Sequence, residues 1–167
     1  KALLSYSQMH EEGIEPNQQT FVTALQACGV LADLSFYQQK HMRGVSLSIC
    51  QSLHNDVQKM GISSDLLIVT TLLSTYGKCG ALEKAQEVFD EILDKNVVSW
   101  SALIAGFSQH GHGKQAMDYF ERMPNEGMLP NTITFVNVLT ACVGTAEGFH
   151  KGKRTHNEIE SRGLLLE

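Results

Sequence analysis

The sequence has no closely spaced pair of cysteines, which distinguishes it from disulfide-stapled and zinc-finger proteins. Its four cysteines, Cys28, Cys50, Cys79 and Cys142, lie far apart, and no C-x-x-C pair occurs. Such spacing favours free thiols in a reducing compartment over a disulfide framework. Because Cys28 and Cys142 end two similar segments, we expect both to be buried and to pack like small hydrophobic side chains.

The chain also has no excess of positive charge. It carries 13 Lys and Arg against 18 Asp and Glu, a formal net charge of −5. A protein that holds nucleic acid mainly through the phosphates needs the opposite sign. The charge therefore counts against nucleic-acid binding, although a repeated structure can gather positive charge on one face.

No hydrophobic run is long enough to cross a bilayer, so no membrane partner is predicted. The longest uncharged run, residues 97–113, is interrupted by Ser, Gln, His and Gly, whereas a membrane helix needs about 20 mostly apolar residues. The apolar content of 43% still suffices for a packed core. No targeting peptide is visible. Because Lys1 falls in the middle of a repeated unit, we expect an excerpt of a longer protein whose start could carry such a signal.

The sequence does contain an internal repeat. GIEPNQQTFVTALQAC at residues 13–28 reappears as GMLPNTITFVNVLTAC at residues 127–142. A shorter echo relates residues 85–89 to residues 116–120, about thirty residues later, which is a repeat period typical of stacked helical arrays. In such arrays a surface is built once per repeat, so we expect function on that surface rather than in one active-site pocket.

Apolar residues within each unit recur with the period of a helix. Leu103, Ile104 and Phe107 predict one helix, and residues 116–123 predict a second that ends before Gly127. The preceding unit follows the same plan, and no strand-like alternation competes. The sequence therefore predicts an all-α solenoid of helix-turn-helix repeats.

The first long copy carries an insertion. About 12 extra residues fall between Asp33 and Ile49, and their mixed composition could extend a helix or form a loop. We interpret the insertion as one that a surface tolerates. A partner-binding element is the alternative.

Three motifs stand out: the turn YGKCG at residues 76–80, the opening VVSWSALI at residues 97–104 and the terminal Pro-Asn pairs. Together they resemble the pentatricopeptide repeat family, and more narrowly its plant-type PLS subfamily, in which P, L and S variants alternate. Tetratricopeptide repeats have a similar length, but their Trp-x-x-Leu-Gly-x-x-Tyr helix is absent. The resemblance covers essentially the whole chain and implies a right-handed superhelical solenoid. It divides the chain into residues 1–17 (second half of a P-type repeat), 18–65 (L-type with the insertion), 66–96 (S-type), 97–131 (P-type) and 132–167 (L-type).

The resemblance implies binding of single-stranded RNA, one base per repeat. In the family, the fifth and last residues of a repeat contact the base edge and the second packs against the base face. These positions give the base readers Thr70 with Asn96 and Ser101 with Asn131, and the packing residues Leu67 and Val98. A hydroxyl with a final Asn resembles the family's adenine-reading pair, because a hydroxyl and a carboxamide match an adenine edge. We therefore predict 5′-AA-3′ opposite residues 66–131.

The other reading positions predict weak base preference or none. Val22 and Val136 occupy fifth positions, and an isopropyl group makes no polar base contact. Asp65 and Glu167 end the same repeats. Asn17 ends the first repeat, whose fifth residue precedes the sequence.

Each predicted reader also has a plainer alternative role. Thr70 could cap a helix or bond back to a carbonyl. Asn96 and Asn131 could be turn residues. Leu67 and Val98 could pack in the core.

No catalytic residue, metal site or cofactor is predicted. Plant-type arrays often end in a cytidine deaminase domain, which needs His-x-Glu and Pro-Cys-x-x-Cys; HEE at residues 10–12 fits the first half, and the second does not occur. His110 and His112 lack partners at metal-ligand spacing. His54 and His156 recur at equivalent positions, which indicates a packing role.

Together these features predict a segment of an RNA-specificity factor that is not itself an enzyme. From the resemblance we expect single-stranded organellar RNA as partner, a task in C-to-U editing or RNA processing, other editing or processing factors nearby, and location in a mitochondrion or chloroplast. The alternative is a protein-interaction scaffold that reads no RNA, which the net charge favours.

Overall fold

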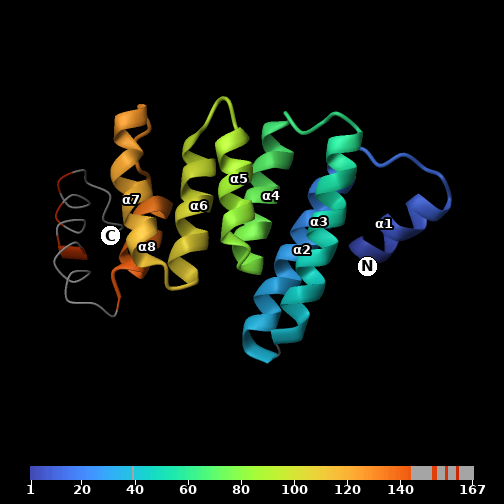
Figure 1. The fold of residues 1–167 in the computed structure, drawn as a ribbon, viewed down its shortest axis with the longest axis horizontal. Coiled ribbons are helices and arrows are strands. Elements are labelled where there is room, and N and C mark those ends of the chain that lie inside the picture. Colours follow the sequence, from blue (N-terminus) through green and yellow to red (C-terminus); the bar gives the residue numbers. More distant parts are fainter. Residues whose placement is uncertain (39, 144–151, 154–156, 158–160, 162–167) are drawn as a thin grey trace. The chain divides into compact units, whose positions relative to one another are not determined.

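The computed structural model describes residues 1–38, 40–143, 152–153, 157 and 161 (Figure 1). These residues form helices and turns and no strand, which confirms the predicted all-α class. They fall into two compact units, Lys1–Leu93 and Asp94–Glu167. In the described ranges no helix combines the length and the apolar character needed to cross a bilayer.

The first unit is built from helical hairpins. The helix α2 packs against both α3 and α4, and α4 packs against α5. Figure 1 shows α2 and α3 running side by side over their whole length. The helices are α1 (Ala2–Glu11), α2 (Gln18–Gln38), α3 (Lys40–Lys59), α4 (Leu66–Cys79) and α5 (Leu82–Glu91).

The insertion lengthens both helices of the first hairpin. The helices α2 and α3 contain 21 and 20 residues, whereas α4 and α5 contain 14 and 10. The extra residues between Asp33 and Ile49 therefore continue the two helices. Of the two alternatives that the composition allowed, a longer helix or a loop, the structure has the longer helices.

The ends of α4 show how sequence sets a helix boundary. The Asp65 side chain accepts hydrogen bonds from the backbone N–H groups of Leu67 and Ile68, which have no partner inside the helix. At the other end Gly80 adopts a left-handed conformation with φ of 76°, which glycine reaches without steric penalty. Most of the predicted YGKCG turn is helical: residues 76–79 end α4, and Gly80 is its C-terminal cap.

The core of the first unit holds three thiols and an aromatic cluster. Cys28 and Cys50 are fully buried and Cys79 is 7% exposed. The His54 ring, half-buried, lies 3.0 Å through Nδ1 from the buried Tyr76 hydroxyl. This contact agrees with the predicted packing role of His54.

The second unit packs one helix against two others. The helix α6 contacts both α7 and α8. Its Trp100 is fully buried, and the Arg122 guanidinium lies 5.9 Å from the centre of the Trp100 ring. Cys142 is buried, as its place in the repeated segment predicted. The elements are α6 (Val97–Gln109), α7 (Gly113–Arg122), the 3-10 helix η1 (Pro124–Glu126) and α8 (Thr132–Ala141).

Candidate functional site

The first helix of each hairpin begins at an Asn or Asp cap. Asn17, Asp65, Asn96 and Asn131 precede α2, α4, α6 and α8. Each of these side chains accepts a backbone N–H from the first turn of its helix, because the first N–H groups have no carbonyl partner within the helix. The last residues of the predicted repeats therefore share one geometry.

At Asn96 and Asn131 the cap is reciprocal. The Asn96 Oδ1 accepts the Ser99 N–H at 2.9 Å, and the Asn96 N–H donates to the Ser99 hydroxyl at 3.1 Å. The Asn131 Oδ1 accepts the Thr134 N–H at 3.0 Å. Within the described part of the chain no acceptor meets Nδ2 of either Asn, so each carboxamide turns its oxygen inward and keeps its N–H donors for other partners.

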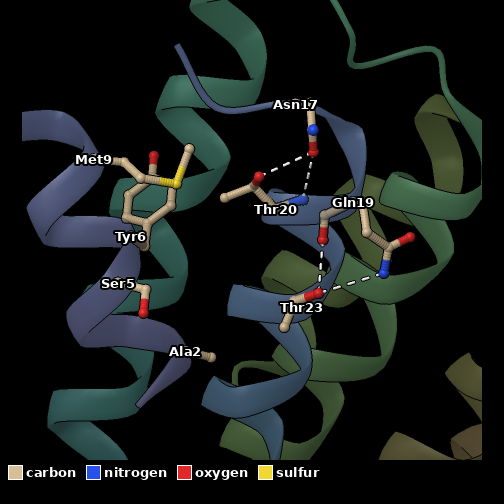
Figure 2. A pocket seen from close by; sticks show the side chains of 8 residues that line it. All are labelled: Ala2, Ser5, Tyr6, Met9, Asn17, Gln19, Thr20 and Thr23. Atoms are coloured by element: carbon tan, nitrogen blue, oxygen red, sulfur yellow. Dashed lines mark hydrogen bonds between the residues drawn. The ribbon is translucent and has the colours of Figure 1, made fainter. Parts of the chain in front are cut away.

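The same chemistry is visible at Asn17 in Figure 2. The Asn17 Oδ1 accepts both the N–H and the hydroxyl of Thr20 at 2.9 Å. Beside it, α1 and the start of α2 line a groove of about 350 Å³, with Tyr6 and Met9 on the α1 side. The sequence analysis missed this groove because its walls meet only through tertiary packing.

The two predicted hydroxyl readers are both hydrogen-bonded. Thr70 is half-buried, and its Oγ1 donates to the carbonyls of Leu66 at 2.7 Å and Leu67 at 3.2 Å. Thr70 thus makes the bond to a carbonyl of its own helix that the sequence analysis gave as its alternative role. Ser101 is 6% exposed, and its Oγ lies 2.7 Å from the Thr134 Oγ1. A threonine or serine oxygen still has lone pairs for a ligand after donating its proton.

The predicted packing residues stand at the surface. Leu67 is 51% and Val98 56% exposed, which excludes the alternative that they are core residues. Ile133 takes the corresponding place in α8 and is 63% exposed. The sequence analysis did not single out Ile133, although the second position of residues 132–167 was the signal that could have found it.

The predicted weak positions differ from one another. Val22 is 3% exposed, whereas Val136 is 56% exposed. Asp65 caps α4 and also accepts the Gln18 Nε2 at 2.7 Å through Oδ2. Glu167 and His156 lie outside the described residues.

The histidines and acidic groups of the described ranges gather into no metal site, since no cluster of three or more ligating side chains was found there. His110 donates through Nδ1 to the Gly106 carbonyl at 3.0 Å. His10 lies exposed in the last turn of α1.

Helical hairpins recur along the chain, and the first helix of each begins at an Asn or Asp cap. This recurrence is typical of a helical-repeat protein. Residues 95–144 match the profile described as PPR repeat family, and residues 68–97 match the one described as PPR repeat. The chain belongs to the pentatricopeptide repeat family.

Relatives from Arabidopsis thaliana support this assignment. The pentatricopeptide repeat-containing protein At4g21065 is 36% identical over 143 residues, covering 85% of this chain and 22% of that protein. The pentatricopeptide repeat-containing protein CRR2, chloroplastic, is 38% identical over 157 residues, covering 92% of this chain and 22% of that protein. The chain thus spans about a fifth of the length of these relatives.

A solved structure has the same fold. The crystal structure of the pentatricopeptide repeat protein PPR10 in complex with an 18-nt psaJ RNA element superposes with a TM-score of 0.70 at 20% identity, covering 98% of this chain and 23% of that chain. The fold class predicted from the sequence, an all-α helical-repeat solenoid, is confirmed. The described residues form an array of pentatricopeptide repeats.

Proposed function

We propose that the chain binds single-stranded RNA and that residues 66–131 read two successive adenines, 5′-AA-3′. The observation that carries the proposal is the orientation of the carboxamides of Asn96 and Asn131. Their oxygens are held by the caps, which leaves the Nδ2–H groups as donors. Leu67 and Val98 stand exposed one residue after the start of a first helix, where an aliphatic side chain can pack against a base.

The hydrogen-bonding pattern suits an adenine edge. Adenine presents an amino donor at N6 beside an acceptor ring nitrogen. Thr70 spends its proton on backbone carbonyls, so toward a ligand its oxygen only accepts. An accepting hydroxyl such as that of Thr70 suits the N6–H of adenine and opposes the O6 acceptor of guanine. A donating amide such as that of Asn96 suits the adenine N1 and opposes the guanine N1–H.

The wider role follows from the family. We place the repeats at residues 1–17, 18–65, 66–96, 97–131 and 132–167, a division supported by the caps that precede α2, α4, α6 and α8. The complex of PPR10 with an RNA element and the organellar names of several relatives support a PLS-type factor for editing or processing in a mitochondrion or chloroplast. Fluorescent tagging of the full-length protein would test the location.

The double substitution Asn96→Asp with Asn131→Asp tests the reading. Aspartate keeps the cap, as Asp65 does for α4, but replaces each outward donor with an acceptor oxygen. We expect the preferred dinucleotide to change from AA to GG, because guanine offers two adjacent donors, N1–H and N2–H, to a pair in which both the hydroxyl and the aspartate accept. Each mismatched base should cost about 1–3 kcal/mol of binding free energy. Fluorescence anisotropy with ten-nucleotide strands that differ only in the dinucleotide measures the change.

The control is Asn125→Asp, an exposed residue of η1 outside every cap. It should leave the adenine preference unchanged. An unchanged preference in the double variant would show that Asn96 and Asn131 are not readers. Equal and negligible affinity of the unaltered protein for all strands would instead favour an interaction scaffold, for which the net charge of −5 is the supporting observation.

A further inference from the structure

Three side chains of the second unit form a chain of hydrogen bonds, Ser101–Thr134–Asn131, that joins α6 to the start of α8. Thr134, fully buried in the first turn of α8, places its Oγ1 at 3.0 Å from the Asn131 Oδ1 and at 2.7 Å from the Ser101 Oγ. The backbone N–H of Asn131 donates to the same Thr134 oxygen at 3.3 Å. Thr134 therefore joins the two side chains that residues 97–131 would use to read a base.

The protons in this network have one consistent arrangement. The Asn131 Oδ1 carries no hydrogen, so Thr134 must donate in the 3.0 Å bond. A hydroxyl has one proton, and Thr134 has then spent it. Ser101 must donate in the 2.7 Å bond, which fills the second lone pair of the Thr134 oxygen.

This arrangement gives the two readers fixed and opposite roles. Ser101 has given its proton to Thr134 and can offer a ligand only lone pairs. Asn131 has its Oδ1 occupied by the N–H and the hydroxyl of Thr134, and can offer only Nδ2–H. A serine and an asparagine, each able to donate or accept in isolation, together become one acceptor and one donor.

We propose that Thr134 is a positioning residue that sets the hydrogen-bond polarity of the Ser101–Asn131 pair, and so decides that amino bases are accepted and keto bases rejected. This inference rests on the RNA-binding function proposed above. Adenine and cytosine carry an amino donor beside a ring acceptor, which matches the pair. Guanine and uracil carry a keto acceptor beside a ring N–H, which opposes it. Thr134 acts through its two partners and need not touch the base.

The arrangement in which a second hydroxyl takes the proton of a reader occurs at Ser101 and not at Thr70. Thr70 commits its proton to carbonyls of its own helix and needs no second hydroxyl. Ser99, at the place in α6 that Thr134 has in α8, donates instead to the backbone carbonyl of Asn96 at 2.8 Å. The polarity of the Ser101–Asn131 pair therefore depends on a residue thirty-three positions beyond Ser101.

The substitution Thr134→Val removes the hydroxyl and keeps the shape. Ser101 regains a free proton with which it can donate to a keto oxygen, and Asn131 loses one of the bonds that hold its oxygen. The full chain is titrated with four strands, 5′-UUUUAXUUUU-3′ with X as A, C, G or U, in fluorescence anisotropy. We expect the ratio of affinities for amino over keto bases at X to fall about tenfold, within the discrimination that good polar base contacts supply.

Controls separate this effect from loss of fold. Thr134→Ser keeps the hydroxyl and should restore the ratio. Thr140→Val alters an exposed threonine of α8 whose hydroxyl donates to the Val136 carbonyl, and should leave the ratio unchanged. A partly unfolded variant weakens all four strands by the same factor, so the ratio does not follow stability. Should Thr134→Val melt below the assay temperature, Thr134→Cys, with a weakly bonding thiol, should show the same relaxation.

The outcomes are distinct. A reduced ratio in Thr134→Val with rescue by Thr134→Ser supports the assignment. An unaltered ratio in folded Thr134→Val overturns it and leaves the proposed function standing. Equal affinity of the unaltered protein for all four strands overturns both.

Discussion

At the residue scale, three thiols from different helices share the core of the first unit. Cys28, Cys50 and Cys79 come from α2, α3 and α4, and none is more than 7% exposed. Burial, which disfavours the thiolate, raises the pKa of Cys28 to about 12 and that of Cys79 to about 11. Burial likewise raises the pKa of Cys50.

These pKa values predict alkaline sensitivity. A thiol in the unfolded chain loses its proton near pH 8.5, whereas the folded protein keeps it to a much higher pH. The stabilisation is therefore complete below about pH 8.5 and is lost as the pH rises toward 11. Each buried thiol should lower the free energy of unfolding by up to about 1.4 kcal/mol per pH unit in this window. Urea unfolding at pH 7, 8.5 and 10 measures the slope.

The matched variant is Cys79→Ser, because a hydroxyl does not ionise in this range. Its slope against pH should be shallower than that of the unaltered chain, whatever its stability at pH 7. Identical slopes would contradict the assignment of alkaline sensitivity to the thiols.

The sequence assigns the proposed readers to their places in the repeat, but it does not give the hydrogen-bonding states of their side chains. The repeat register places Ser101 and Asn131 at its fifth and last positions, and the exposure of Leu67 and Val98 agrees with the predicted surface role. The proton of Ser101 is committed by Thr134, which α8 brings to within 2.7 Å. A spacing rule within one repeat carries no information about that neighbour.

At the element scale, α7 begins against the end of α8. A Cβ added to Gly113 would clash with the backbone carbonyl oxygen of Ala141, since it would lie closer than real Cβ atoms approach. Backbone cannot move aside as a flexible side chain can. We expect Gly113→Ala to lower the free energy of unfolding by about 1–3 kcal/mol, the range for overpacked sites. Urea denaturation followed by circular dichroism measures it.

Gly44 provides a control for which the expected change in the free energy of unfolding has the opposite sign. It lies exposed within α3, and an added Cβ there would meet nothing within 4 Å. Gly44→Ala should raise the stability of the first unit by about 0.5–1 kcal/mol, because alanine is the better helix former. If both substitutions shifted the unfolding midpoint in the same direction, the close approach of α7 to α8 would not explain the result.

The structure of the insertion could not be predicted from its sequence. Its mixed composition fits a helix or a loop equally well. In the structure α2 and α3 lengthen together and pack along each other. Helix formation gains most of its stability from tertiary packing, so the presence of a partner helix decides what local composition leaves open.

At the scale of the whole molecule, acidic side chains outnumber basic ones by 18 to 13. Within the described residues Lys78 pairs with Asp33, Lys84 with Glu87, and Arg122 with Glu126. We therefore expect RNA affinity to fall only gently with salt, with a slope of log K against log[KCl] shallower than about −2, or about three phosphates at −0.7 each. Anisotropy titrations from 50 to 400 mM KCl measure the slope. A steeper slope would reveal a basic face that tracks the RNA backbone.

The sequence by itself determined the repeated helical hairpins and the burial of the repeated cysteines, because each depends on spacings within one unit. Only the tertiary structure decided that the insertion extends two helices and that Thr134 bonds both Ser101 and Asn131. The physical reason is that the exposure of a side chain and the direction of a hydrogen bond both depend on a second group that lies beside the first. Folding alone brings together pairs that lie a full repeat apart.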